Sequence, residues 1–160
     1  MFIERNLVKA IKVLIKGLKA LSPTGDLLAR IWVAKVFFHS AMLKIASWPA
    51  TLSLFSSHYP IPLLSPEVAA YMATGAELVL PILLLVGLGG RMMILIFFIY
   101  NLIAAIAYDF VWTPTGFAGF DQHLCWGLLL AMLLFHGPGK LSLDYLFLKR
   151  YYTADELYEL

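Results

Sequence analysis

Four stretches of the chain are almost entirely apolar, and each is close to the length of a helix that crosses a lipid bilayer. They cover residues 27–48, 68–88, 91–111 and 118–136. A transmembrane helix needs about 20 apolar residues. The stretches are continuous rather than alternating, which favours helices over a β-barrel, because backbone groups in lipid must bond within their own segment. The pattern predicts an all-α fold, an integral membrane four-helix bundle.

The segment before these stretches has a different pattern. Residues 5–21 read RNLVKAIKVLIKGLKAL, with a lysine at every third or fourth position and apolar residues between. This spacing predicts a basic amphipathic helix over residues 1–21 that lies on an anionic membrane surface. The lysines interrupt any apolar core, so the segment does not resemble a signal peptide. The stretch 22–26, Ser-Pro-Thr-Gly-Asp, is expected to break this helix and cap the next one.

The composition agrees with a chain that uses the bilayer as solvent. Of its 160 residues 61% are hydrophobic and only 14% are charged, whereas soluble domains contain about 25% charged residues. The length allows one compact transmembrane domain over residues 27–150, followed by an acidic cytoplasmic tail over residues 151–160. Cys125 is the only cysteine, which excludes an internal disulfide, a Cys-x-x-Cys redox pair and a thiolate zinc site.

The basic residues predict the orientation of the chain. Lys and Arg gather before and at the start of the first stretch, between the second and third stretches, and after the fourth. The connections 49–67 and 112–121 contain neither residue. By the positive-inside rule, both termini are expected on the cytoplasmic side of the membrane.

Several polar residues are expected deep inside this bundle. Glu77 lies ten positions after Glu67, which places it roughly 15 Å from the outer end of its helix. His39 and Asn101 have similar depths by the same count. A charge that faces lipid at mid-depth costs about 2.5–3.5 kcal/mol, so Glu77 should face the interior and find a cationic partner or stay protonated. Lys44 is the first candidate partner.

Other charged residues are expected nearer the two membrane surfaces. Lys35 and His39 compete with Lys44 for Glu77, but they share a helix face from which Lys44 points away. The outer layer is expected to contain His123, Tyr108, Asp109 and Asp121, and the inner layer Arg30, Arg91 and Asp144.

Taken together, a set of motifs resembles the DoxX family of small bacterial membrane proteins. The set consists of Arg30 with FFHSAMLK at 37–44, AEL at 76–78, GLGGR at 87–91 and GPGKLSLD at 137–144. Two longer stretches, which begin at Ser47 and His123, look like the branch of the family found with copper-linked modified-peptide maturation, the HvfX-type proteins. The resemblance covers roughly residues 27–150.

This resemblance implies a four-helix protein of the bacterial inner membrane, often an accessory subunit beside redox or sulfur-metabolism partners. One relative is the small subunit of a thiosulfate:quinone oxidoreductase. Arg30, Lys44, Glu77 and Arg91 match the charged pattern of the family, while Ser40 replaces a glycine that many relatives carry. No catalytic mechanism comes with the resemblance, so whether the chain is an enzyme stays open.

The functional hypotheses centre on Glu77 and Lys44. An internal polar site could bind a quinone head group or relay protons, or the pair could simply fix the register of two helices. A non-catalytic scaffold and a small proton-coupled carrier are the alternatives. A protein partner or a second copy is expected beside membrane lipids, and the basic arm is better explained by lipid head groups than by nucleic acid.

The resemblance to the HvfX-type branch makes copper a candidate ligand. The methionines, histidines and Cys125 occur without Met-x-x-Met, His-x-His or Cys-x-x-Cys spacing. His39 and Met42 share a helix face at i,i+3 and are the only pair that suggests a metal site. This inventory argues against a metal site within the chain.

Overall fold

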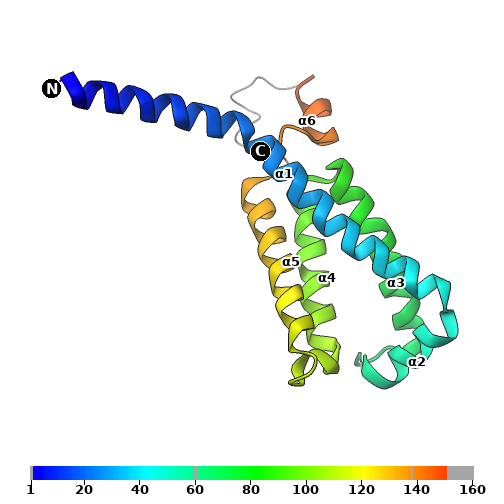
Figure 1. Ribbon diagram of the computed structural model, residues 1–160. Helices are drawn as coiled ribbons and strands as arrows, with labels where there is room; N and C mark the ends of the chain where they lie inside the picture. Colours follow the sequence, from blue (N-terminus) through cyan, green and yellow to red (C-terminus); the bar gives the residue numbers. More distant parts are fainter. Residues whose placement is uncertain (1, 60, 138, 151–160) are drawn as a thin grey trace.

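The computed structural model describes residues 2–59, 61–137 and 139–150, and in that part all regular structure is helical. Figure 1 shows a long first helix that leaves the packed part of the molecule at its N-terminal end. The elements are α1 (Phe2–Ala46), α2 (Trp48–His58), α3 (Pro66–Val86), α4 (Gly90–Ala107), the 3-10 helix η1 (Asp109–Trp112), α5 (Phe117–His136) and α6 (Leu143–Leu148). The expected acidic tail, 151–160, lies outside the described residues.

The expected break between the basic segment and the first apolar stretch does not occur. α1 continues through residues 22–26 with Pro23 inside it. A proline within a helix removes one N–H and crowds the carbonyl four residues earlier, which bends a helix without having to end it. Figure 1 shows the corresponding change of direction between the N-terminal arm, residues 2–21, and the rest of α1.

The core is formed by the second part of α1 together with α3, α4 and α5. α1 packs mainly against α3 and α4 packs mainly against α5, while α1–α5 and α3–α4 contacts join the two pairs. Phe37 of α1 lies at the centre, with its ring 4.8 Å from that of Phe97 and 5.2 Å from that of Trp126, both edge-on. The buried apolar side chains around it include Val33, Leu84, Ile94, Leu130 and Leu133.

Three of these helices are long and apolar enough to cross a membrane, namely α3, α4 and α5. The predicted first span, residues 27–48, does not form a separate apolar helix. It is the end of α1 and contains Arg30, Lys35, His39 and Lys44. Figure 1 nevertheless shows this part of α1 running alongside α3 for most of its length.

The two helix pairs diverge toward the end that carries α2 and η1, called here the α2 end (Figure 1). Much of the connection 49–67 is helical, since it contains most of α2. Pro49 lies in the first turn of α2, where its missing N–H costs nothing. A column of three stacked rings crosses this end, with Tyr59 4.7 Å from Phe55 on one side and 4.7 Å from Tyr108 on the other. The column links the segment after α2 to the end of α4.

Candidate functional site

The centre of the candidate site is an ion pair between α1 and α3. Lys44 Nζ lies 2.6 Å from Glu77 Oε2, and the two side chains are only 12% and 8% exposed. Lys44 stands in the last turn of α1, and Glu77 is on the buried face of α3 with Thr74 and Pro81. The structure therefore pairs Glu77 with the residue that the sequence analysis ranked first.

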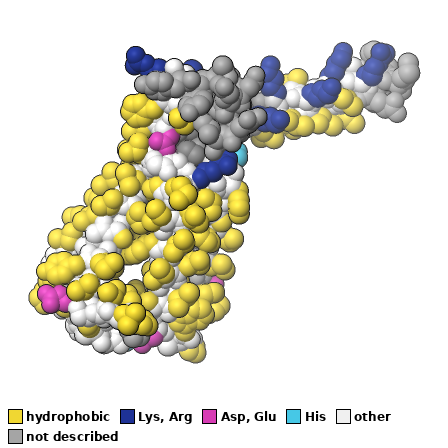
Figure 2. Space-filling view, turned by 180° about the vertical axis from the view of Figure 1, so that it is seen from behind, with side chains coloured by type: hydrophobic (Ala, Val, Ile, Leu, Met, Phe, Trp, Pro, Cys, Tyr) yellow, Lys and Arg dark blue, Asp and Glu magenta, His cyan; other side chains and the backbone are white. Residues whose placement is uncertain are grey.

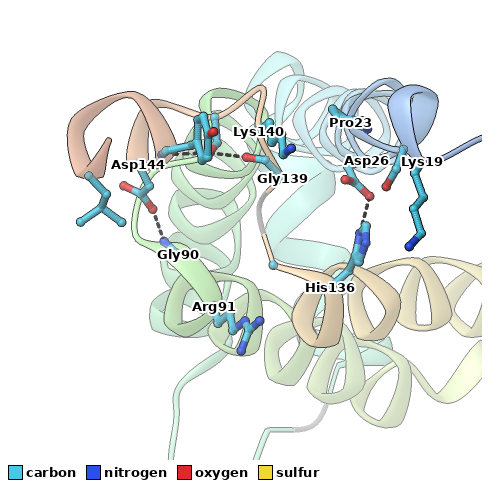
Figure 3. Close-up of a pocket in the computed structure, with 14 residues that line it drawn as sticks. Lys19, Pro23, Asp26, Gly90, Arg91, His136, Gly139, Lys140 and Asp144 are labelled. Atoms are coloured by element: carbon cyan, nitrogen blue, oxygen red, sulfur yellow. Dashed lines mark hydrogen bonds and ion pairs between the residues drawn. The ribbon is translucent and has the colours of Figure 1, made fainter. Parts of the chain in front are cut away.

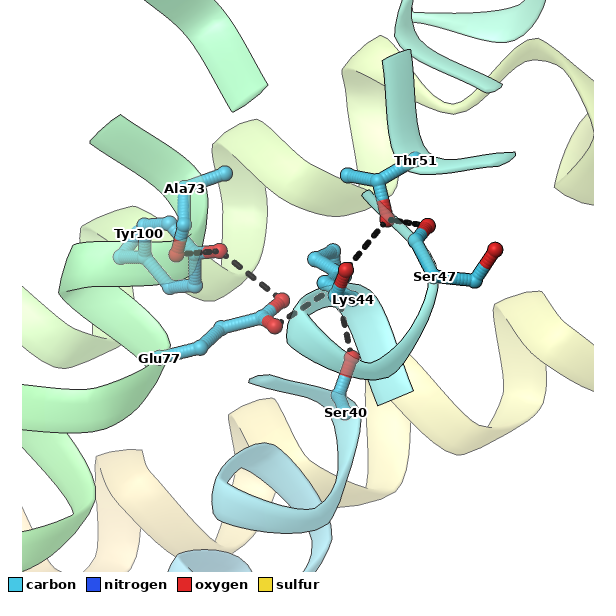
Figure 4. A network of polar contacts seen from close by, with 7 residues as sticks. All are labelled: Ser40, Lys44, Ser47, Thr51, Ala73, Glu77 and Tyr100. Atoms are coloured by element: carbon cyan, nitrogen blue, oxygen red, sulfur yellow. Dashed lines mark hydrogen bonds and ion pairs between the residues drawn. The ribbon is translucent and has the colours of Figure 1, made fainter. Parts of the chain in front are cut away.

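A wider hydrogen-bond network completes this pair (Figure 4). Lys44 Nζ also donates to Ser40 Oγ at 2.7 Å, one turn earlier on α1. The Tyr100 hydroxyl of α4 donates to Glu77 Oε1 at 3.0 Å. Both carboxylate oxygens are therefore occupied, and three helices meet at one carboxyl group.

Thr51 extends the network to the start of α2. Its hydroxyl contacts the Lys44 carbonyl oxygen at 2.9 Å, and the residue is almost fully buried. This bond satisfies an acceptor at the end of α1, where intrahelical partners run out. The α1–α2 corner is thus fixed directly beside the ammonium group.

Two of the expected members of the buried site lie elsewhere. His39 and Lys35 are both exposed on α1. The prediction of His39 as a buried member of the site is wrong, because five residues along a helix from Lys44 turn a side chain by roughly 140°. Asn101 is buried as expected, yet it bonds to α5 and not to Glu77.

Asn101 and His123 form a second polar contact, between α4 and α5. The Asn101 side-chain amide donates to the His123 carbonyl at 3.0 Å, and its oxygen lies 3.0 Å from His123 Nδ1. Gly127 gives this contact space, because a Cβ there would lie 3.2 Å from Asn101 Nδ2. His123 was expected in an outer layer with Tyr108, and it stands in the second turn of α5, where it links α5 to α4.

The α2 end gathers the remaining outer residues. His58 Nδ1 lies 3.0 Å from Asp109 Oδ1, and both side chains are about half exposed. Tyr59 stacks on Tyr108, and burial raises the pKa of the Tyr59 hydroxyl, with Tyr108 and Glu77 adding to the shift. The hydroxyl therefore stays protonated at neutral pH. Asp121 is exposed at the start of α5.

The expected inner charges form a second polar region where α6 meets the α3–α4 turn, called here the clasp (Arg30, Gly87, Gly90, Leu141 and Asp144). Arg30 is fully buried and donates through Nη2 to the Leu141 carbonyl. Asp144 accepts from the Gly90 N–H, and its own N–H donates to the Gly87 carbonyl at 3.1 Å. Arg91 lies nearby and is exposed.

Gly87 explains why this turn needs a residue without a side chain. Its φ is +68°, a left-handed conformation that ends α3. A Cβ there would clash with Arg30 Nη1 and with Ser142. Arg30, Gly87 and Ser142 belong to motifs that are far apart in the sequence, and the fold places them directly against one another.

Sequence reasoning did not place Tyr100 beside Glu77 or His58 beside Asp109. Tyr100 is one residue before Asn101, and a depth count could have placed it beside Glu77, but an aromatic residue in an apolar stretch gives no polar signal. Among the described residues no group of three His, Cys, Asp or Glu side chains could hold a metal ion.

Comparisons with known proteins identify the family. The DoxX family model matches residues 25–110, just over half of the chain. An uncharacterized protein of Haemophilus influenzae is 30% identical over 139 residues, which cover 82% of this chain and 88% of that protein. No solved structure matches. The chain therefore belongs to the DoxX family, and its apolar helices make it a membrane protein.

Proposed function

We propose that this DoxX-family protein is an accessory subunit of a membrane redox or metal-linked maturation pathway, in which Lys44, Glu77 and Tyr100 bind a quinone head group. The main support is the burial of an ammonium, a carboxylate and a phenol in mutual hydrogen bonds where α1, α3 and α4 meet. Ionisable groups at membrane depth are costly and mark ligand or proton pathways by default.

The chemistry of the network suits such a ligand. A quinone presents two carbonyl oxygens that accept hydrogen bonds, and its ring needs an apolar, preferably aromatic, slot. Lys44 and Tyr100 are donors, and Phe37 lies 6.2 Å from Tyr100, ring to ring. Glu77 could take up a proton when Lys44 or Tyr100 turns toward a ligand.

The proposed membrane placement follows from the distribution of charge. Figure 2 shows the Lys and Arg side chains gathered at the end with the arm and α6, while the body below is mostly hydrophobic. Together with the positive-inside rule, this supports a bacterial inner-membrane protein with both termini cytoplasmic and the end of α1 as a fourth span. The wide apolar surface favours assembly with a protein partner or a second copy.

A non-catalytic scaffold, such as a maturation factor of the HvfX-type branch, is the second candidate. One observation favours it: Lys44 and both oxygens of Glu77 already have partners inside the protein. A pair whose hydrogen bonds are all made inside the protein needs no ligand, and its whole role can be to fix the register of two helices. The two candidates differ in whether the pair ever exchanges a partner for a ligand.

Quinone content separates the two. The full chain is purified from bacterial membranes in mild detergent, and its bound quinone is extracted and quantified per chain. The quinone-binding proposal predicts a stoichiometric quinone in the unmodified protein. It also predicts that Glu77→Gln lowers the retained amount about tenfold, which corresponds to the loss of one charge-assisted hydrogen bond.

Glu67→Gln is the matched control, because it makes the same change on an exposed position of the same helix. It should retain as much quinone as the unmodified protein. Absence of quinone from the unmodified protein, together with a stable partner protein that survives Glu77→Gln, would establish the scaffold instead.

A further inference from the structure

A cavity at the opposite end of the molecule is not part of this site. It has a volume of about 650 Å³ and lies between the end of the arm, the start of α4, the end of α5 and α6. Figure 3 shows its charged side chains reaching it from separate elements. The basic ones are Lys19, Arg91, His136 and Lys140, and the acidic ones are Asp26 and Asp144.

Both acidic side chains of the cavity are engaged within the protein. Asp26 is 7% exposed and lies 2.9 Å from His136 Nδ1, and Asp144 accepts from the Gly90 N–H (Figure 3). Gly139 packs directly on Asp26, since a Cβ at this position would lie 2.8 Å from Asp26 Oδ2. Neither carboxylate is therefore arranged to bind a cation that enters the cavity.

Two of the basic side chains are accessible from the cavity. Lys19 and Arg91 are exposed, one on α1 and one at the start of α4. Behind the cavity Arg30 follows Asp26 by one turn of α1. It is fully buried, and its Nε and Nη1 have no hydrogen-bond partner among the described residues. The buried guanidinium adds positive potential behind the cavity.

Part of the remaining lining is apolar, beside the hydroxyl groups of Ser22 and Ser142. Pro23, Tyr145 and Leu148 form part of the wall. The arm, whose C-terminal end borders the cavity, exposes a row of large apolar side chains, Leu7, Val8, Ile11, Leu14, Ile15 and Leu18. A helix of this kind lies with its apolar face in the acyl boundary and its lysines at the level of lipid head groups.

We propose that this cavity binds the phosphate of an anionic phospholipid, with Arg91 and Lys19 as its main cationic contacts. Arginine matches phosphate geometry through its planar fork of donors, and lysine adds a point charge. The apolar wall and the neighbouring arm receive the glycerol and the first part of the acyl chains. The chemistry therefore fits a lipid better than a free anion, which would gain nothing from apolar walls.

Native mass spectrometry of the full chain in detergent tests the assignment. Phosphatidylglycerol and phosphatidylcholine with identical acyl chains are added separately, and bound lipid is counted. Phosphatidylglycerol should be retained preferentially. Removing one cation should weaken its binding roughly fivefold, so Arg91→Gln with Lys19→Gln should weaken it roughly twenty-five-fold.

The control variant is Lys35→Gln with Arg150→Gln, two exposed cations outside the arm, on α1 and after α6, that do not line the cavity. It should retain the lipid, and far-UV circular dichroism should show both variants to be helical. Equal losses in the two double variants would overturn the site, since binding would then depend on overall charge. Inorganic phosphate that binds alone and displaces the lipid would overturn the lipid assignment.

Discussion

The buried charges in the Lys44–Glu77 network and the charged side chains of the clasp find their partners in different ways. Glu77 and Lys44 neutralise each other, side chain to side chain, across α1 and α3. Arg30 and Asp144 bind backbone groups of the α5–α6 connection and of the α3–α4 turn. In the network, both partners are side chains and can be substituted together. In the clasp, one partner of each bond is a backbone group, which a substitution does not remove.

Removing one member of the network should have the largest effect. We expect Lys44→Met to lower the free energy of unfolding by about 3–5 kcal/mol, because Glu77 then lacks its cationic partner in an apolar setting. Titration of the protein from mild detergent into a denaturing detergent measures this quantity. Lys35→Met, on an exposed face of the same helix, should change it by at most about 0.5 kcal/mol.

The double variant Lys44→Met with Glu77→Met sharpens the comparison. It should recover most of the lost stability, since replacing a whole buried pair by apolar side chains is often neutral or stabilising. A double variant that is as unstable as Lys44→Met alone would show that other interactions hold α1 to α3.

Gly87→Ala tests the clasp. We expect a loss of about 2–4 kcal/mol in the same titration, because alanine at φ +68° is strained and its Cβ would displace Arg30 and Ser142. Gly75→Ala is the control on the same helix, where a Cβ would meet nothing within 4 Å. There alanine should be neutral or stabilise α3 by roughly 0.5–1 kcal/mol. Equal effects of the two substitutions would contradict the described packing of the clasp.

The Asn101–His123 contact should contribute less. Asn101→Leu is expected to cost about 0.6–1.7 kcal/mol, the range measured for hydrogen bonds between transmembrane helices. Thermal unfolding in detergent, followed by circular dichroism, detects a change of this size. Gln122→Leu, which makes the same substitution on an exposed position of α5, should leave the midpoint unchanged.

The smallest effect is expected at the α2 end. Asp109→Asn removes the negative charge beside His58. The side chains of His58 and Asp109 are 47% and 55% exposed. Exposed pairs contribute about 0–1 kcal/mol and are screened by salt. The difference from the unmodified protein should therefore be measurable only at low ionic strength. A large loss that persists in high salt would assign this contact a structural role comparable to that of Lys44–Glu77.

The sequence predicted those features that depend on hydrophobicity along one helix. Continuous apolar stretches located α3, α4 and α5, and the cost of a charge in lipid pointed to Lys44 as the partner of Glu77. Depth counting selected Glu77 and Asn101, which are buried, but also His39, which is exposed, because it gives the level of a residue in a helix and not its face.

Features that depend on contacts between distant segments could not be predicted in this way. Pro23 bends α1 instead of ending it, since the loss of one helical hydrogen bond does not force the chain out of the helix. The partner of Asn101 is set by how α5 packs on α4, and the buried position of Arg30 by the path of the α5–α6 connection. Neither leaves a periodic signal in the sequence.

The ionised state of Glu77 is the central claim, and infrared difference spectroscopy tests it most directly. Spectra of the unmodified protein and of Glu77→Gln are recorded in lipid at neutral pH and subtracted. A carboxylate bound to Lys44 predicts that the substitution removes carboxylate stretching bands and leaves the carbonyl region of protonated carboxylic acids unchanged. Loss of a protonated-acid band, with the carboxylate bands intact, would contradict the ion pair.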